Sequence, residues 1–62
     1  MLTIKQARLV AGLTQKQMSD TFDIPLRTIE SWESGVRKPP KYVERLIVEK
    51  LTQITKEKAE QE

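Results

Sequence analysis

The side chains of this sequence that are best suited to bind another molecule are its cations, and they are unevenly spaced. Residues 1–41 carry seven Lys or Arg and four Asp or Glu, and residues 42–62 carry four and five, so the net charge of +2 combines +3 with −1. Guanidinium and ammonium groups bind anions, so the first two thirds of the chain favour an anionic partner. The cations Arg37, Lys38 and Lys41 flank two adjacent prolines. Because most basic loops contact only solvent, this cluster alone does not decide a function.

The residue types that are missing exclude most catalytic chemistry. The 62 residues include no Cys, no His and only two Gly. This leaves no thiol nucleophile, no histidine base, no Cys/His zinc site and no glycine-rich phosphate loop. A chain of this length buries only about 60% of its unfolded surface, which predicts one small domain with a thin core. We therefore expect a binding protein that is not an enzyme and that holds no metal and no cofactor.

The N-terminal stretch and the apolar runs argue against a membrane or secreted protein. Lys5 and Arg8 interrupt the first apolar segment, where a signal peptide would be continuously apolar. No run reaches the roughly 18 apolar residues of a membrane-spanning helix. We expect a cytoplasmic protein.

Helices must position these side chains, because the apolar residues follow a helical period and no strand-like alternation is found. Ile4, Ala7, Arg8 and Ala11 share one face of a first helix, which ends at Gly12.

A second helix is predicted to begin at Gln15. Thr14 and Gln17 have the spacing of a capping box, in which two side chains bind the free backbone groups at a helix start. Met18 and Phe22 are the expected buried residues of this helix.

A third helix is predicted to begin near Pro25 or Leu26. Proline disfavours helical geometry in the residue before it and suits the first turn of a helix, and the Asp two residues earlier tolerates a tight left-handed turn. The third helix is expected to bury Ile29 and Trp32 and to end where Ser34 is followed by glycine. The proline-rich segment 36–40 is a predicted loop.

The fourth helix is predicted to begin around Pro40 and to carry an unusually wide apolar face. This face spans about 180° at 100° per residue and leaves Val48 outside it. The polar segment 55–62 is expected to be a helical extension or a disordered tail, so that residues 1–54 form the domain. The apolar face consists of Tyr42, Val43, Leu46, Ile47, Leu51 and Ile54.

The second and third helices have the length and spacing of a helix-turn-helix. Large apolar residues stand at the packing positions, and the small Ser19 stands where the two helices would cross. Hairpins of two helices are common and mostly unrelated to nucleic acids. The spacing alone therefore fits either a DNA-binding helix-turn-helix or an ordinary helical hairpin.

The string GLTQKQMSDTFDIPLRTIESWESGVRKPP resembles the Cro/CI-type (XRE-family) helix-turn-helix of phage repressors and small bacterial regulators. The resemblance extends from Ile4 to Leu51. It implies an all-α repressor-like domain of four helices, or of five as in many relatives, that binds DNA in the cytoplasm at the nucleoid. The chain departs from the family at Asp23, where glycine is usual.

The resemblance also implies roles for side chains around the third helix, whose N-terminal residues enter the major groove in such proteins. Arg27 is the main candidate, because a guanidinium can bind guanine with two hydrogen bonds, although a phosphate contact or a solvated arginine would fit as well. Leu26 offers only apolar contact, for example with a thymine methyl group. The expected base-reading residues are Leu26, Arg27, Thr28 and Ser31, and the expected phosphate-binding residues are Gln15, Gln17, Arg37, Lys38 and Lys41.

Two charged residues stand at positions that require a partner. Arg8 lies on the apolar face of the first helix, and Glu33 lies in the last turn of the third, where the helix dipole disfavours an acid. We expect them to form a buried structural ion pair, as the matching positions of the family do.

We expect the chain to be a repressor that binds double-stranded DNA at a pseudo-palindromic operator. A homodimer formed through residues 42–54 would present two recognition helices. The alternative is an antitoxin-like or adaptor module that uses the same fold to bind a protein, because a fold does not determine a function.

Overall fold

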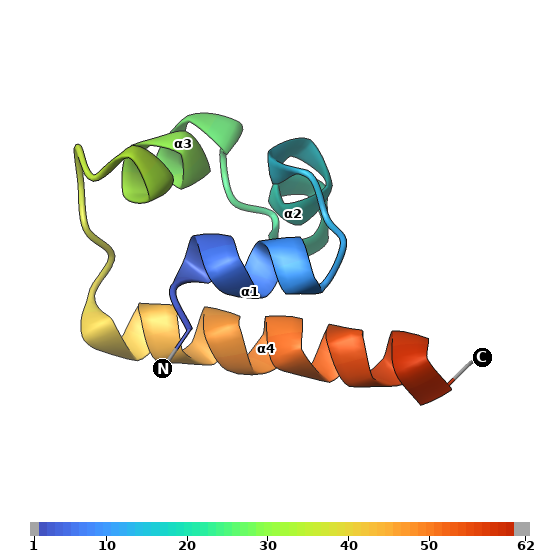
Figure 1. Cartoon of the computed structure of the whole chain (residues 1–62). Helices are drawn as coiled ribbons and strands as arrows, with labels where there is room; N and C mark the ends of the chain where they lie inside the picture. The colour runs from blue at the N-terminus through green and yellow to red at the C-terminus, as the bar shows by residue number, and fades with distance from the viewer. Residues whose placement is uncertain (1, 61–62) are drawn as a thin grey trace.

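The computed structural model describes residues 2–60, which form four helices and no strands. The helices are α1 (Ile4–Val10), α2 (Gln15–Phe22), α3 (Leu26–Ser34) and α4 (Lys41–Glu60). Figure 1 shows α1 lying along α4, with α2 and α3 on the side of α1 that faces away from α4. The predicted all-α architecture is therefore confirmed, with four helices and not five among the described residues.

Two capping boxes fix the starts of α1 and α2. In the predicted box, the Gln17 amide donates to Thr14 Oγ1 over 3.0 Å and the Thr14 amide donates to Gln17 Oε1 over 2.8 Å. Thr3 and Gln6 make the same pair of bonds at the start of α1, over 3.0 and 3.1 Å. The sequence analysis did not identify this first box, although its pattern is the same.

The turn between α2 and α3 depends on Ser19 and Asp23. Asp23 has a left-handed backbone with φ of 56°, a conformation that Asp adopts more readily than most residues. Ser19 Oγ donates to the Ile24 carbonyl over 2.6 Å, and the Ile24 amide donates to the Ser19 carbonyl over 3.1 Å. The small residue expected at the helix crossing thus also binds the turn, which sets the angle at which α3 leaves α2.

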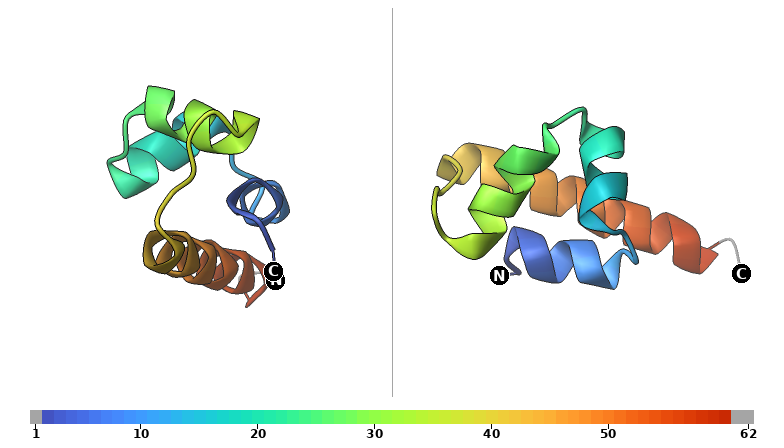
Figure 2. Two further views of the ribbon diagram at one scale, coloured as in Figure 1. Left: turned by 90° about the vertical axis from the view of Figure 1, so that its left-hand side faces the viewer. Right: turned by 90° about the horizontal axis from the view of Figure 1, so that it is seen from above.

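The core is small and draws on all four helices. Phe22 and Trp32 are half-buried and pack against it. α1 packs against α4, and α2 packs against α3. Figure 2 shows α4 as the longest element, passing beneath the three shorter helices. The buried apolar residues are Ile4, Ala7, Ala11, Met18, Ile29, Ile47, Val48 and Leu51.

The buried face of α4 differs from the predicted one. Val48, predicted to lie outside the apolar face, is only 9% exposed, whereas Tyr42 and Leu46 are 70% and 60% exposed. Viewed down the helix axis, the buried stripe has Val43 at one edge, Val48 at the other and Leu51 between them. It covers about 140° of the circumference at 100° per residue. The buried stripe is the side of α4 that packs against the other helices, and Tyr42 and Leu46 lie outside it.

The polar extension of α4 is helical through Glu60, and it contacts α1. Lys58 Nζ donates to the Ala11 carbonyl over 2.7 Å and so binds a free carbonyl group at the end of α1. Residues 61 and 62, which belong to the predicted extension or tail, lie outside the described residues. None of the helices within residues 2–60 is long and apolar enough to cross a membrane.

Candidate nucleic-acid interface

Helix α3 has an inner face in the core and an outer face that carries the predicted base-reading residues. Ile29 is fully buried on the inner face. Leu26 and Arg27 are exposed, and Thr28 and Ser31 are half-buried. Figure 1 shows α3 on the opposite side of the molecule from α4. The outer face of α3 is therefore accessible to a large partner.

The backbone after α3 brings the basic loop against this helix. Gly35 adopts a left-handed conformation with φ of 85°, and the Arg37 amide donates to the Ser31 carbonyl over 3.2 Å. As a result, predicted base-reading residues and predicted phosphate-binding residues line one open depression. Leu26, at the start of α3, lies outside it. The lining of the depression includes Arg27, Thr28, Ser31, Arg37 and Lys38. We call the exposed cations Arg27, Arg37, Lys38 and Lys41 the basic surface.

A second depression lies on the other side of the loop. Lys38 and Lys41 line it together with Lys5 from the first turn of α1, and Ile4, Trp32 and Pro39 add apolar surface. Lys5 is a candidate that the sequence analysis missed. Its position on α1, three residues before Arg8, was the available signal, because residues three apart on a helix face the same side.

Beneath the basic surface, Arg8 and Glu33 form an ion pair. Arg8 Nε and Nη2 donate to the two carboxylate oxygens of Glu33 over 2.8 and 2.9 Å, and Nη1 donates to the Leu13 carbonyl over 2.8 Å. Gln15 Nε2 donates to Glu33 Oε1 over 3.2 Å. The side chains of Arg8 and Glu33 are only 9% and 5% exposed. We call Arg8, Leu13, Gln15 and Glu33 the polar junction, because they connect α1, α2 and α3.

The surroundings of Glu33 favour its ionised form. Burial raises the pKa of Glu33, but the hydrogen bonds from Arg8 and Gln15 and the positive charges of Arg8 and Lys5 outweigh it, so that the pKa lies below its ordinary value. The carboxylate is therefore charged at neutral pH and matches the buried guanidinium.

The start of α2 is the other predicted phosphate site. Gln15 is half-buried and its amide is directed to Glu33, whereas Gln17 is exposed and its side-chain oxygen accepts from Thr14. The first backbone amides of a helix lack partners within the helix, so α2 presents donors at this end in addition to the two glutamine side chains.

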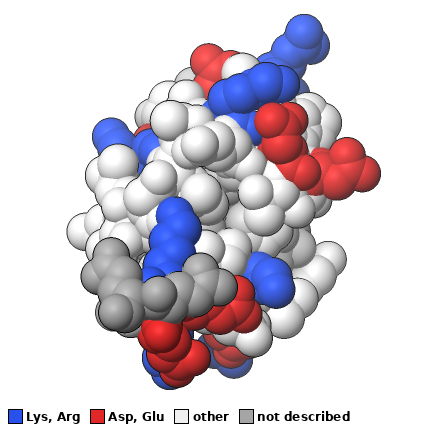
Figure 3. Space-filling view, turned by 90° about the vertical axis from the view of Figure 1, so that its right-hand side faces the viewer, with Lys and Arg blue, Asp and Glu red and all other residues white. Residues whose placement is uncertain are grey.

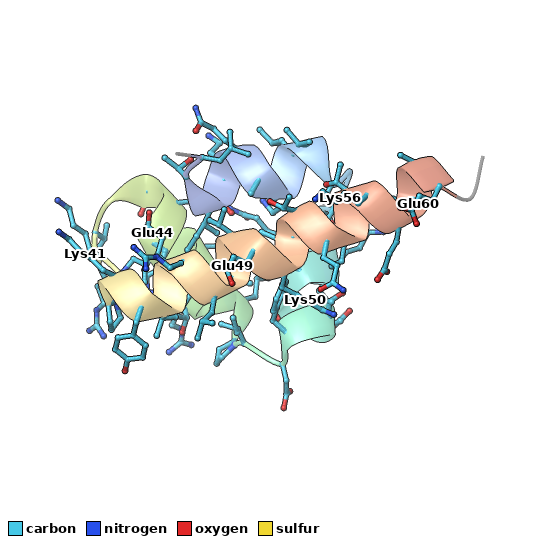
Figure 4. All side chains as sticks on the ribbon, turned by 90° about the horizontal axis from the view of Figure 1, so that it is seen from below. Lys41, Glu44, Glu49, Lys50, Lys56 and Glu60 are labelled. Carbon is cyan, nitrogen blue, oxygen red and sulfur yellow. The ribbon has the colours of Figure 1, made fainter. Side chains whose placement is uncertain are left out.

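Charge is distributed differently elsewhere on the molecule. The end of the molecule that includes the end of α4 shows both acidic and basic side chains, with uncharged surface between them (Figure 3). Both signs also occur along α4, where Glu44 and Glu49 are followed by Lys50 and Lys56 (Figure 4). Among residues 2–60, the ion pairs are Arg8–Glu33 and Lys16–Asp20, and no group of carboxylates could hold a metal ion. The cations of the basic surface thus have no carboxylate within 4.0 Å in the described part of the chain.

Comparison with known proteins gives one match. A family model described as helix-turn-helix covers residues 4–54, which includes α1, α2, α3 and most of α4. Neither a curated protein nor a solved structure matches the chain. The matched range contains the whole polar junction and the basic surface. The chain therefore belongs to the Cro/CI-type (XRE) helix-turn-helix family of DNA-binding transcription regulators.

Proposed function

We propose that the chain is a sequence-specific transcriptional repressor that inserts α3 into the major groove. The observation that supports this most strongly is the open depression shared by Arg27, Thr28 and Ser31 of α3 and by Arg37 and Lys38 of the loop. Base edges lie inside the groove and phosphates lie at its rims, so a reader needs both kinds of side chain next to each other. The repressor role follows the resemblance to phage repressors.

In this proposal Arg27 and Leu26 read neighbouring bases. The Arg27 guanidinium donates to O6 and N7 of a guanine, a contact that is worth roughly 1–3 kcal/mol against a wrong base. Leu26, which is 37% exposed, packs against a thymine methyl group. Thr28 and Ser31 supply hydroxyl groups that can donate to or accept from a base edge.

Phosphates are bound on both sides of α3. The start of α2, with Gln15 and Gln17, contacts one stretch of backbone, and Arg37, Lys38 and Lys41 contact another. These contacts fix the register of α3 on the duplex without reading the sequence.

A homodimer would place two copies of α3 on a pseudo-palindromic operator, with half-sites about 34–36 Å apart. The surface that we propose for the second copy is narrower than the range 42–54 and consists of Tyr42 and Leu46. These exposed apolar side chains are four residues apart and therefore adjacent on α4. The alternative function, an adaptor that binds a different protein, would use the same surface.

Selection from a pool of randomised duplexes tests the proposal. We expect the recovered half-sites to contain a guanine and a neighbouring thymine. The logarithm of the binding constant should fall with the logarithm of the salt concentration, with a slope of about −0.9 per neutralised phosphate. Replacing that thymine by uracil, which lacks only the methyl group, should weaken binding by the wild-type chain and not by Leu26→Ala. Reduced transcription from a promoter that carries the operator would support repression.

Two outcomes would contradict parts of this proposal. If no duplex binds at low salt, the regulator function is wrong and the adaptor function takes its place. If sedimentation shows that single copies bind the two half-sites independently, and the selected duplexes show no preferred spacing between half-sites, the homodimer is wrong and the DNA-binding part remains.

A further inference from the structure

One cation on α1 lies between the two proposed groups of phosphate-binding residues. Lys5 lines the depression that contains Lys38 and Lys41, and it also lines a polar depression that contains Gln15 and Ser34. The start of α2 and the basic loop are separated along the chain, but both border on the space around the Lys5 side chain. Lys5 is exposed and stands in the first turn of α1.

The charges around Lys5 leave it available for an anion. Glu33 lines both depressions, but its carboxylate is held by Arg8. Each depression has one further carboxylate, Glu44 in one and Glu30 in the other. Neither is within 4.0 Å of the Lys5 ammonium group, since the ion pairs of residues 2–60 are those of Arg8 and Lys16. The depression with Lys38 and Lys41 thus holds three ammonium groups against the single unpaired carboxylate of Glu44.

The apolar lining of this depression strengthens the attraction. Ile4, Trp32 and Pro39 line the depression together with the three lysines, so part of its wall is apolar. Low-dielectric walls concentrate the field of nearby charges towards the open side of a cleft.

We propose that Lys5 binds a backbone phosphate, so that the DNA-contacting surface continues from the start of α2 across α1 to the loop before α4. This inference rests on the proposed function, because it assumes that α3 binds DNA. It adds a contact from a helix outside the helix-turn-helix. The phosphate bound by Lys5 lies between the phosphates bound at Gln15 and at Lys41.

The experiment compares Lys5→Gln with Lys50→Gln. Both variants lose one positive charge, but Lys50 lies on α4, on the opposite side of the molecule from α3 (Figure 4). Operator affinity is measured by fluorescence anisotropy over a series of KCl concentrations. For Lys5→Gln we expect the slope of log K against log salt to become less steep by about 0.9 for each bound copy of the chain. For Lys50→Gln we expect the wild-type slope.

Two further measurements separate phosphate binding from a structural role. Lys5→Arg keeps the charge and should retain the wild-type slope, and Lys5→Gln should unfold at the wild-type temperature and keep the same sequence preference. Equal slopes for Lys5→Gln and Lys50→Gln would overturn the inference and leave the proposed function intact. Absence of binding by the wild-type chain at low salt would overturn both.

Discussion

The polar junction and the basic surface are neighbouring regions whose charged side chains differ in burial and pairing. In the junction, Arg8 and Glu33 are almost completely buried and bound to each other through two hydrogen bonds. On the basic surface, Arg27 and Arg37 are exposed and have no carboxylate within 4.0 Å among the described residues. A buried charge must be paired, because its desolvation is expensive, whereas an exposed charge is stable in water and stays free to bind an anion. The difference separates a junction whose charges satisfy each other from a surface whose charges are free to bind an anion.

The two regions meet at the end of α3. Glu33 lies two residues before Gly35, where the chain turns back to bring the basic loop beside the helix. By holding Glu33, Arg8 and Gln15 fix this end of α3 against α1 and α2. Through the pair of Arg8 and Glu33, the junction therefore positions the basic surface.

The largest expected effect is that of breaking the junction. Arg8→Ala leaves the Glu33 carboxylate buried without its partner, and loss of one member of a buried pair lowers the free energy of unfolding by about 3–5 kcal/mol. A folded chain of 62 residues has a total free energy of unfolding of only about 3–9 kcal/mol. We therefore expect the variant to be substantially unfolded at 37 °C. Thermal and urea unfolding followed by circular dichroism measure this change.

The matched control is Arg27→Ala, which removes the same side chain from the exposed surface. This variant should change the free energy of unfolding by no more than about 0.5 kcal/mol, as is usual for surface positions. A shift of only a degree or so in the melting temperature of Arg8→Ala would show that the junction does not stabilise the fold.

The second effect concerns DNA discrimination. Arg27→Ala should reduce the preference for guanine at one position of the half-site by roughly 1–3 kcal/mol, because only the base contact is lost. Arg37→Ala should weaken binding to all duplexes equally and make the salt slope less steep by about 0.9. Competition binding with single-base operator variants distinguishes the two. Equal loss of affinity for every duplex with Arg27→Ala would assign this residue to a phosphate.

The local signals that define these regions are readable in the sequence. The capping box at Thr14, the proline before Leu26 and the glycine after Ser34 each act within a few residues, so the bounds of α2 and α3 could be predicted. The ion pair could be predicted as well, because Arg8 stands on an apolar face and Glu33 stands at an unfavourable helix end.

Features that depend on the packing of distant segments could not be predicted in this way. Tyr42 and Leu46 are apolar like Val48, and the packing of α4 against the other helices decides that Val48 is the one that is buried. The bond from Lys58 to Ala11 joins residues 47 positions apart. The spacing of Lys5 from Arg8 indicates only which side of α1 it faces, and its place between two depressions depends on how α1 packs against α3 and the loop.

The third effect is a loss of stability in acid. The native pKa of Glu33 is lowered, so its charge stabilises the fold above the pKa of the unfolded chain, and this contribution is lost as the pH falls through the native pKa. The loss should be smaller than that in Arg8→Ala, because protonated Glu33 keeps its place and one oxygen that can accept from Arg8. Urea unfolding from pH 7 to pH 3 measures it. The variant Glu33→Gln should lose most of this dependence, and an unchanged pH profile would contradict the role of the charge.

The smallest expected effect is that of the exposed ion pair, Lys16–Asp20. Its atoms are 3.5 Å apart and its side chains are 72% and 68% exposed, so water screens the attraction. The order, with the cation nearer the helix start, is also the less favourable one for residues four apart. We expect a coupling of no more than about 0.3–0.5 kcal/mol in a double-mutant cycle of Lys16→Ala and Asp20→Ala. The corresponding cycle of Arg8 and Glu33 should give a coupling several times larger. If the two couplings were equal, burial would not make the Arg8–Glu33 pair stronger than an exposed ion pair. The stability of the fold would then have to come from its apolar core alone.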